Sequence, residues 1–161
     1  MGEKLAALLG YEWVDLDAYI ESKIGLSIPE IFKEKGEDGF RAIEAEAIRD
    51  LLVMHILTGT DMVLSLGGGS LEIGALRDYI LENSLCLYLE ASEKTLSERL
   101  GKDLCGRPVL EKCADMGELL QKREKNYKLA QETVRTDELN VEQVAQAAYD
   151  IIRSTTDDKR V

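Results

Sequence analysis

Three consecutive glycines, Gly67, Gly68 and Gly69, follow a short apolar run and most constrain what this chain can fold into. The preceding segment 62–66, rich in Val and Leu, predicts a short β-strand buried on both faces. Because glycine costs backbone entropy, a triplet favours unusual backbone angles or the close approach of a ligand. In open α/β sheets, ligands bind beyond the carboxyl ends of the strands, where this loop would lie. A plain tight turn would give the same pattern.

Apolar periodicity predicts strands that alternate with helices along the chain, without an internal repeat. This alternation indicates the α/β class with a parallel sheet. The expected strands lie at 11–15, 62–66, 85–89 and 133–136. The expected helices lie at 1–9, 18–24, 28–35, 37–57, 71–81, 93–100, 116–130 and 141–153.

The length of the chain suits one domain, which we place at residues 1–153, followed by a polar tail at 154–161. Residues 101–110 lack an apolar period and contain an arginine, so we expect a lid loop at about 101–115.

The formal net charge of −11 argues against nucleic acid or an anionic membrane as a partner, because either needs a basic face. A small anionic ligand would therefore need local arginines. No apolar run is long enough to cross a membrane, and the first residues lack the apolar core of a signal peptide. The three cysteines match no zinc spacing and predict reduced thiols in a cytoplasmic protein, which we expect to be a monomer.

Two pairs of charged residues allow a structural and a functional interpretation. Asp15 ends the expected strand 11–15, and Asp17 follows it by two residues. Both carboxylates could face a site beyond the strand or simply cap the next helix. Arg41 and Glu44 are three residues apart on an expected helix, where they could form an ordinary surface ion pair.

An ordered set of motifs, spread from the first residue to about residue 152, resembles the shikimate kinase family of P-loop kinases. The first matching motifs are Val-Asp-Leu-Asp at 14–17, Ser-Ile-Pro-Glu-Ile-Phe at 27–32 and Gly-Phe-Arg at 39–41. The others are the glycine triplet at 67–69, Arg-Pro-Val-Leu at 107–110, and Lys-Arg at 122–123 with a tyrosine at 127. The resemblance implies a parallel sheet with helices on both faces.

The resemblance also implies a reaction, the transfer of the γ-phosphoryl group of ATP to the 3-hydroxyl of shikimate with Mg²⁺. This step belongs to the biosynthesis of aromatic amino acids. Asp15 matches the carboxylate that serves the metal, usually through water. Asp17 matches the carboxylate that holds the accepting hydroxyl and takes its proton. Arg107, on the expected lid, would bind ATP and neutralise charge on the transferring phosphoryl group.

The remaining matches form the implied shikimate site. Arg41 and Arg123 match the pair that grips the substrate carboxylate, which guanidinium groups can bind bidentately. Glu44 would orient Arg41, and the backbone N–H groups of the glycine loop would face the substrate. The apolar residues expected near its ring are Ile28, Phe32 and Phe40.

One departure from the family is large, because this sequence lacks the Gly-x-x-Gly-x-Gly-Lys-[Ser/Thr] phosphate loop and the strand before it. In the family that strand lies in the middle of the sheet, between the strands at 63–66 and 85–89. We therefore expect a sheet without its first central strand, with backbone groups left unpaired.

Two explanations fit this departure: an N-terminally truncated form of a working kinase, which we favour because the site residues are present, or a natural remnant that binds a ligand without catalysis. A protein-interaction module on the same scaffold stays open, and a gluconate-type kinase fits the two arginines less well.

Overall fold

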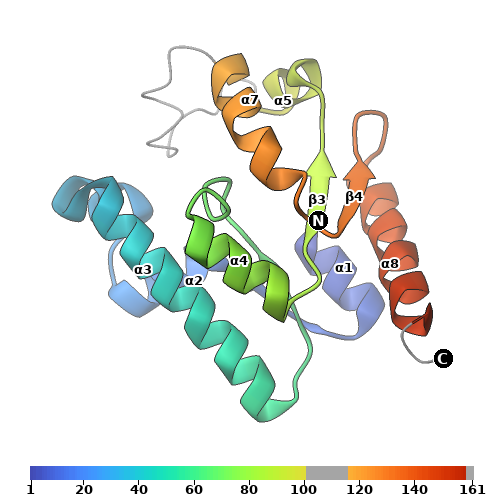
Figure 1. The fold of residues 1–161 in the computed structure, drawn as a ribbon, viewed down its shortest axis with the longest axis horizontal. Coiled ribbons are helices and arrows are strands. Elements are labelled where there is room, and N and C mark those ends of the chain that lie inside the picture. The colour runs from blue at the N-terminus through green and yellow to red at the C-terminus, as the bar shows by residue number, and fades with distance from the viewer. Residues whose placement is uncertain (101–115, 159–161) are drawn as a thin grey trace.

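The computed structural model describes residues 1–100 and 116–158, and its helices and strands alternate along the chain as predicted (Figure 1). The helices are α1 (Gly2–Leu9), α2 (Leu16–Ile24), α3 (Ile28–Thr58), α4 (Gly74–Asn83), α5 (Glu93–Leu100), α7 (Met116–Tyr127) and α8 (Val141–Asp158). The strands are β1 (Glu12–Asp15), β2 (Met62–Ser65), β3 (Leu87–Glu90) and β4 (Glu132–Arg135).

Several helix boundaries differ from the sequence-based expectation, among them the end of α7, which lies at Tyr127 rather than at residue 130. The two helices expected at 28–35 and 37–57 form one element, α3, which is kinked at Gly36, where φ is 70°. Helix α4 begins at Gly74, three residues later than expected, because turns occupy the segment just before it. Helix α8 continues into the expected polar tail, where the Thr155 hydroxyl lies 3.4 Å from Glu132 of β4.

Local signals fix where α3 begins, and α3 carries part of the candidate site. Gly25 ends α2 in the left-handed conformation, with φ at 77°. The carboxylate of Glu30 then accepts a hydrogen bond of 2.8 Å from the backbone N–H of Ser27 at the helix start.

The described strands form two separate parallel pairs rather than one sheet. Strand β1 pairs with β2, with Val14 opposite Leu64, and β3 pairs with β4, with Leu89 opposite Val134. Helices cover both faces of the first pair, as side-chain alternation along β2 shows. Met62 and Leu64 pack against the cluster built by α2, α3 and α4, whereas Val63 packs against α1 and α8.

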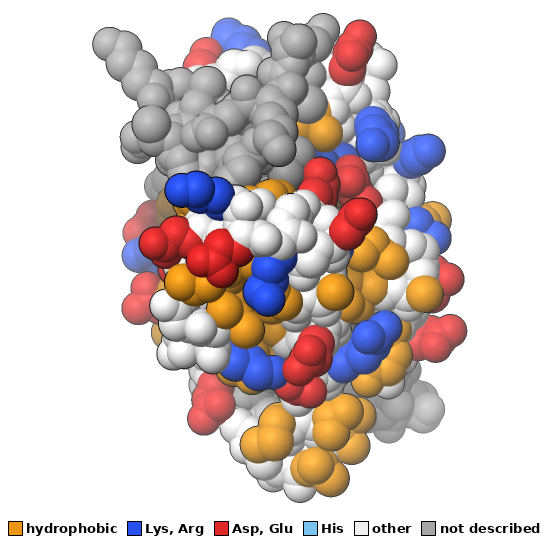
Figure 2. Space-filling view, turned by 90° about the vertical axis from the view of Figure 1, so that its left-hand side faces the viewer, with side chains coloured by type: hydrophobic (Ala, Val, Ile, Leu, Met, Phe, Trp, Pro, Cys, Tyr) orange, Lys and Arg blue, Asp and Glu red, His pale blue; other side chains and the backbone are white. Residues whose placement is uncertain are grey.

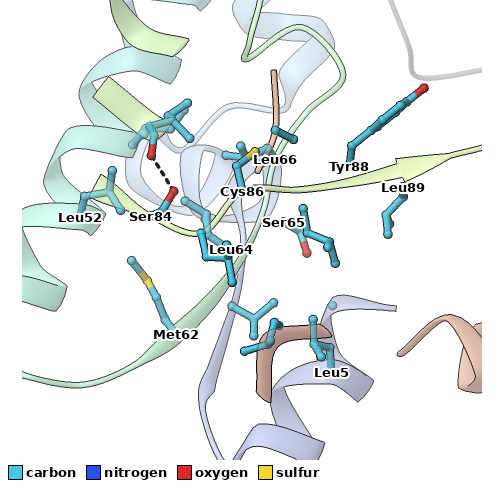
Figure 3. Close-up of a pocket in the computed structure, with 18 of the residues that line it drawn as sticks. Leu5, Leu52, Met62, Leu64, Ser65, Leu66, Ser84, Cys86, Tyr88 and Leu89 are labelled. Carbon is cyan, nitrogen blue, oxygen red and sulfur yellow. Dashed lines mark hydrogen bonds between the residues drawn. The ribbon is translucent and has the colours of Figure 1, made fainter. Parts of the chain in front are cut away.

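A cavity of about 600 Å³ separates the two strand pairs (Figure 3). Residues 62–68 line one side, residues 83–89 line the other, and Met1 and Gly2 also line it. Among the described residues, β2 and β3 have no strand partner on the edges away from β1 and β4. The cavity lies where the resemblance implied a missing central strand.

The prediction that strand 62–66 is buried on both faces is wrong, because its side chains are partly exposed. All four residues of β2 are only partly buried, and in β3 the exposed fraction of Leu89 is 37%. The apolar composition is that of a central strand, but each strand borders the cavity along one edge, and this leaves its side chains accessible.

The surface mixes both signs of charge despite the acidic total (Figure 2). Hydrophobic side chains gather at the lower end of this view, at the height where α3 ends in Figure 1. The large exposed apolar residues near that helix end are Val53, Met54, Ile56 and Leu57. No helix within the described ranges is both long enough and apolar enough to span a bilayer.

Candidate active site

The glycine loop leaves the carboxyl end of β2 and forms a tight turn before α4. The Ser70 N–H donates to the carbonyl of Gly67 at 3.2 Å, and the Glu72 N–H donates to that of Gly69 at 3.0 Å. None of the three glycines has a positive φ. The unusual backbone angles that the sequence allowed are therefore absent, and the loop does form a tight turn; close approach of a ligand to the loop stays a prediction.

Side chains from three helices crowd against these glycines. A Cβ added at Gly69 would lie 2.5 Å from the guanidinium carbon of Arg41, and one at Gly68 would lie 3.2 Å from Nη1 of Arg123. A Cβ at Gly67 would lie 3.8 Å from Oδ1 of Asp17. The loop therefore brings together residues that are more than one hundred positions apart in the sequence.

Arg41 projects from α3 and is held by a buried carboxylate. Its Nη1 donates to Oε2 of Glu44 at 2.8 Å, and the side chain of Glu44 is 1% exposed. The Ser70 hydroxyl donates to the other oxygen of Glu44 at 2.7 Å. Burial opposes the charge of Arg41, but the hydrogen bond and charge of Glu44 outweigh it and raise the pKa of the guanidinium. The ordinary surface ion pair that the sequence allowed is excluded by this burial.

Arg123 projects from α7 on the other side of the loop. Its Nε donates to Oε1 of Glu72 at 2.9 Å, with the two side chains 11% and 22% exposed. One turn later, the Tyr127 hydroxyl donates to the carbonyl of Gly68 at 2.5 Å. Burial raises the pKa of that hydroxyl, and the nearby charge of Arg123 acts in the opposite direction. Lys122, the neighbour of Arg123 in sequence, is exposed to solvent.

The two aspartates lie where β1 passes into α2. Oδ1 of Asp15 accepts a hydrogen bond of 3.0 Å from the Ala18 N–H, so this carboxylate caps the helix. Asp17 lies in the first helical turn, exposed and beside Gly67. Among the described residues, no group of three side chains could hold a metal ion. Asp15 therefore has the capping role, and its second oxygen could still serve a cation.

Two aromatic residues pack beside Arg41. The ring centroids of Phe32 and Phe40 are 4.6 Å apart, and the Arg41 guanidinium lies 5.5 Å from the Phe40 ring. Phe40 is buried in the core, whereas Phe32 and Ile28 are partly exposed. Arg107 and the expected lid at 101–115 lie outside the described residues.

Two contributors to the site escaped the sequence analysis. Ser70 and Glu72 lie in the turn after the glycines, whereas the sequence analysis placed Glu72 in a helix expected from residue 71, so the directions of these side chains were not predicted. The only signal in the sequence that they belong to the site is that they follow Gly69 by one and three residues. Tyr127 belonged to the matching motifs, but its contact with Gly68 was not foreseen.

The arrangement suits a compound that carries both a carboxylate and a hydroxyl. Arg41 and Arg123 supply guanidinium groups on either side of the loop, which match the geometry of a carboxylate. Asp17, at the first glycine of the loop, supplies an oxygen that can accept a hydroxyl proton.

Comparisons with known proteins agree with this geometry. A shikimate kinase from Chlorobium limicola is 40% identical over 149 residues, which cover 85% of this chain and 71% of that protein. One from Bacillus subtilis is 36% identical over 147 residues, 90% of this chain and 77% of that protein. The solved shikimate kinase from Acinetobacter baumannii in complex with shikimate superposes with a TM-score of 0.84 at 30% identity, covering 96% of this chain and 85% of that one. The family model for shikimate kinase matches residues 1–153, and the chain therefore belongs to the shikimate kinase family.

Proposed function

We propose that this site binds shikimate and that the chain has the activity of its family, shikimate kinase. The observation that carries the proposal is the contact of one glycine loop with both guanidinium groups and with the aspartate. The substrate carboxylate would lie between Arg41 and Arg123, with its hydroxyl at Asp17. The solved relative from Acinetobacter baumannii, which was crystallised with shikimate, supports the same substrate.

The reaction is a phosphoryl transfer for which kinases of this family use ATP as the co-substrate. The 3-hydroxyl oxygen bonds to the γ-phosphorus, the bond from that phosphorus to the β-γ bridging oxygen breaks, and ADP leaves. Asp17 accepts the hydroxyl proton, and Arg107 offsets charge on the transferring group.

The carboxylate of Asp15 is a hard oxygen ligand of the kind that magnesium prefers. Mg²⁺ in kinases is held by one or two carboxylates, waters and the phosphates of the substrate rather than by a full protein cage. One carboxylate oxygen of Asp15 caps α2, and the other oxygen can serve the ion. The ion, when bound, would neutralise phosphate charge.

An assay for phosphorylated shikimate tests the proposed activity directly, because a chain that only bound the substrate would not convert it. We also propose a cytoplasmic monomer with no nucleic-acid or membrane partner.

Titration calorimetry with shikimate tests the proposed site. We expect Arg123→Lys to weaken binding roughly tenfold or more, because an ammonium cannot donate two parallel hydrogen bonds to one carboxylate. Lys122→Ala is the matched control, since Lys122 lies on the exposed side of the same helix. Equal losses in the two variants would indicate a diffuse basic patch and contradict the proposed grip.

A further inference from the structure

Each of the two arginines of the proposed site has one close carboxylate partner, and residues of a single turn take part in both pairs. Arg41 also has a longer contact of 3.5 Å to Glu37, whose side chain is exposed. Glu44 holds Arg41 and is itself held by the Ser70 hydroxyl. Arg123 is held by Glu72. Ser70 and Glu72 both belong to the turn that follows the glycine loop, so the loop and the two arginine partners form one unit.

Backbone hydrogen bonds fix this turn. The N–H groups of Ser70 and Glu72 donate to the carbonyls of Gly67 and Gly69, respectively, so each polar residue is tied to a glycine three positions earlier. Glu72 thus has little freedom in its backbone, and its partly buried side chain extends to Arg123. The ion pair is more shielded from water than an ordinary surface pair.

We infer that Glu72 is a positioning residue for Arg123, an inference that rests on the proposed shikimate site. Glu72 accepts a hydrogen bond of 2.9 Å from Nε of the guanidinium, and Nη1 lies beside Gly68 of the glycine loop. A guanidinium is planar, so fixing Nε and the plane also fixes the direction of the Nη1 and Nη2 donors. Glu72 therefore directs this edge of Arg123 toward the substrate carboxylate.

A competing role for Glu72 predicts the opposite effect. A carboxylate next to Arg123 could act as an internal anion that reduces the attraction for the substrate, and the charge of Glu72 also acts on Arg41. The contact, however, does not span the Nη1 and Nη2 fork that binds a carboxylate bidentately. Positioning and competition therefore differ in the sign of the change in affinity.

Three variants of the full chain separate these roles. Glu72→Gln keeps an acceptor for Nε and removes the charge, whereas Glu72→Ala removes both. Asp50→Ala is the matched control because Asp50 also pairs with a cation, Lys23, at 2.7 Å, but on the outer side of α3. The measurements are the shikimate dissociation constant and the NMR signal of the Arg123 Nε–H, assigned with Arg123→Lys.

We expect Glu72→Ala to weaken shikimate binding about tenfold and to speed hydrogen exchange at the Arg123 Nε–H. Glu72→Gln should stay within about threefold of the unmodified chain and keep that proton protected, and Asp50→Ala should change neither quantity. Tighter binding in both Glu72 variants would overturn positioning in favour of competition. Unchanged binding in Glu72→Ala would also overturn it, leaving a purely structural ion pair.

The two measurements also separate this inference from the proposed function. If the unmodified chain does not bind shikimate, the proposed function fails, and positioning of a substrate group fails with it. The Nε–H signal then still decides whether Glu72 holds Arg123, because that measurement needs no substrate.

Discussion

The cavity between β2 and β3 predicts that an added strand will stabilise this protein. The perturbation is an N-terminal fusion of a short apolar strand followed by the glycine-rich phosphate loop of the family. Met1 and Gly2 line the cavity, so the fused segment would enter it directly. A control fusion carries a Gly-Ser segment of equal length in place of the strand.

The size of the effect follows from the two free strand edges, each of which is four residues long. A four-residue strand paired on both sides would make on the order of eight backbone hydrogen bonds, each worth about 0.5–1.5 kcal/mol net. Ordering four residues costs about 4–8 kcal/mol of backbone entropy, which offsets most of that gain. The surplus comes from apolar side chains at about 1.5–3 kcal/mol each, so we expect a net gain on the order of 5 kcal/mol.

Thermal unfolding measures this gain, which corresponds to a rise in Tm of roughly 10–20 °C for a chain of this size. Cys86 offers a second measurement because it lines the cavity and is only partly buried. With Cys105 and Cys113 replaced by Ser, the fused strand should slow alkylation of Cys86, whereas the Gly-Ser control should not. A fusion that melts no higher than its control would show that the cavity does not accept a strand.

Three further predictions concern the chemistry of the site. Residues 1–161 alone should show little shikimate kinase activity, far below the roughly 1–100 s⁻¹ typical of kinases, because they lack the lysine and backbone donors of the phosphate loop; a coupled ATP assay within that range would contradict this. In an active fused form, Asp17→Asn should lower kcat much more than it raises KM, because an amide still reaches the hydroxyl but cannot accept its proton; an effect confined to KM would refute that role. Gly69→Ala should weaken shikimate binding, because the new Cβ would displace the Arg41 guanidinium at a cost of about 1–3 kcal/mol. The control Gly74→Ala meets only an ordinary contact of 3.6 Å and should bind normally.

Most elements of the fold could be predicted from local sequence signals. Helix α5 has the predicted bounds, and the four strands lie within two residues of their expected positions. These elements have strong apolar periods or clear capping residues. The exposure of β2 could not be predicted from its composition, because burial depends on which strands are its neighbours.

The residues of the candidate site also divide into those selected from the sequence and those that only the structure shows. Helical spacing alone favoured an ordinary surface ion pair for Arg41 and Glu44, and the family resemblance selected these two residues and Arg123 as site residues. Ser70 and Glu72 lie in a turn whose side-chain directions depend on hydrogen bonds between backbone groups of the glycine loop. Such directions have no sequence period, and a structure is needed to show them.

Most residues of the proposed shikimate site come from one side of the cavity. Arg41, Glu44 and Asp17 are carried by α2 and α3, which pack with β2 and the glycine loop, and only Arg123 comes from α7. None of the described contacts between the glycine loop and these side chains requires a strand in the cavity. Substrate binding and phosphoryl transfer should therefore be separable in this chain.

This separation has a measurable consequence. Because the fused strand would fill the cavity without replacing any partner of Arg41 or Arg123, it should raise the turnover number while changing the shikimate dissociation constant by less than about threefold, a difference of roughly 0.6 kcal/mol. Calorimetry on the original and fused chains makes the comparison directly. A large gain in shikimate affinity on fusion would show instead that the arginines reach their binding geometry only when the cavity is filled.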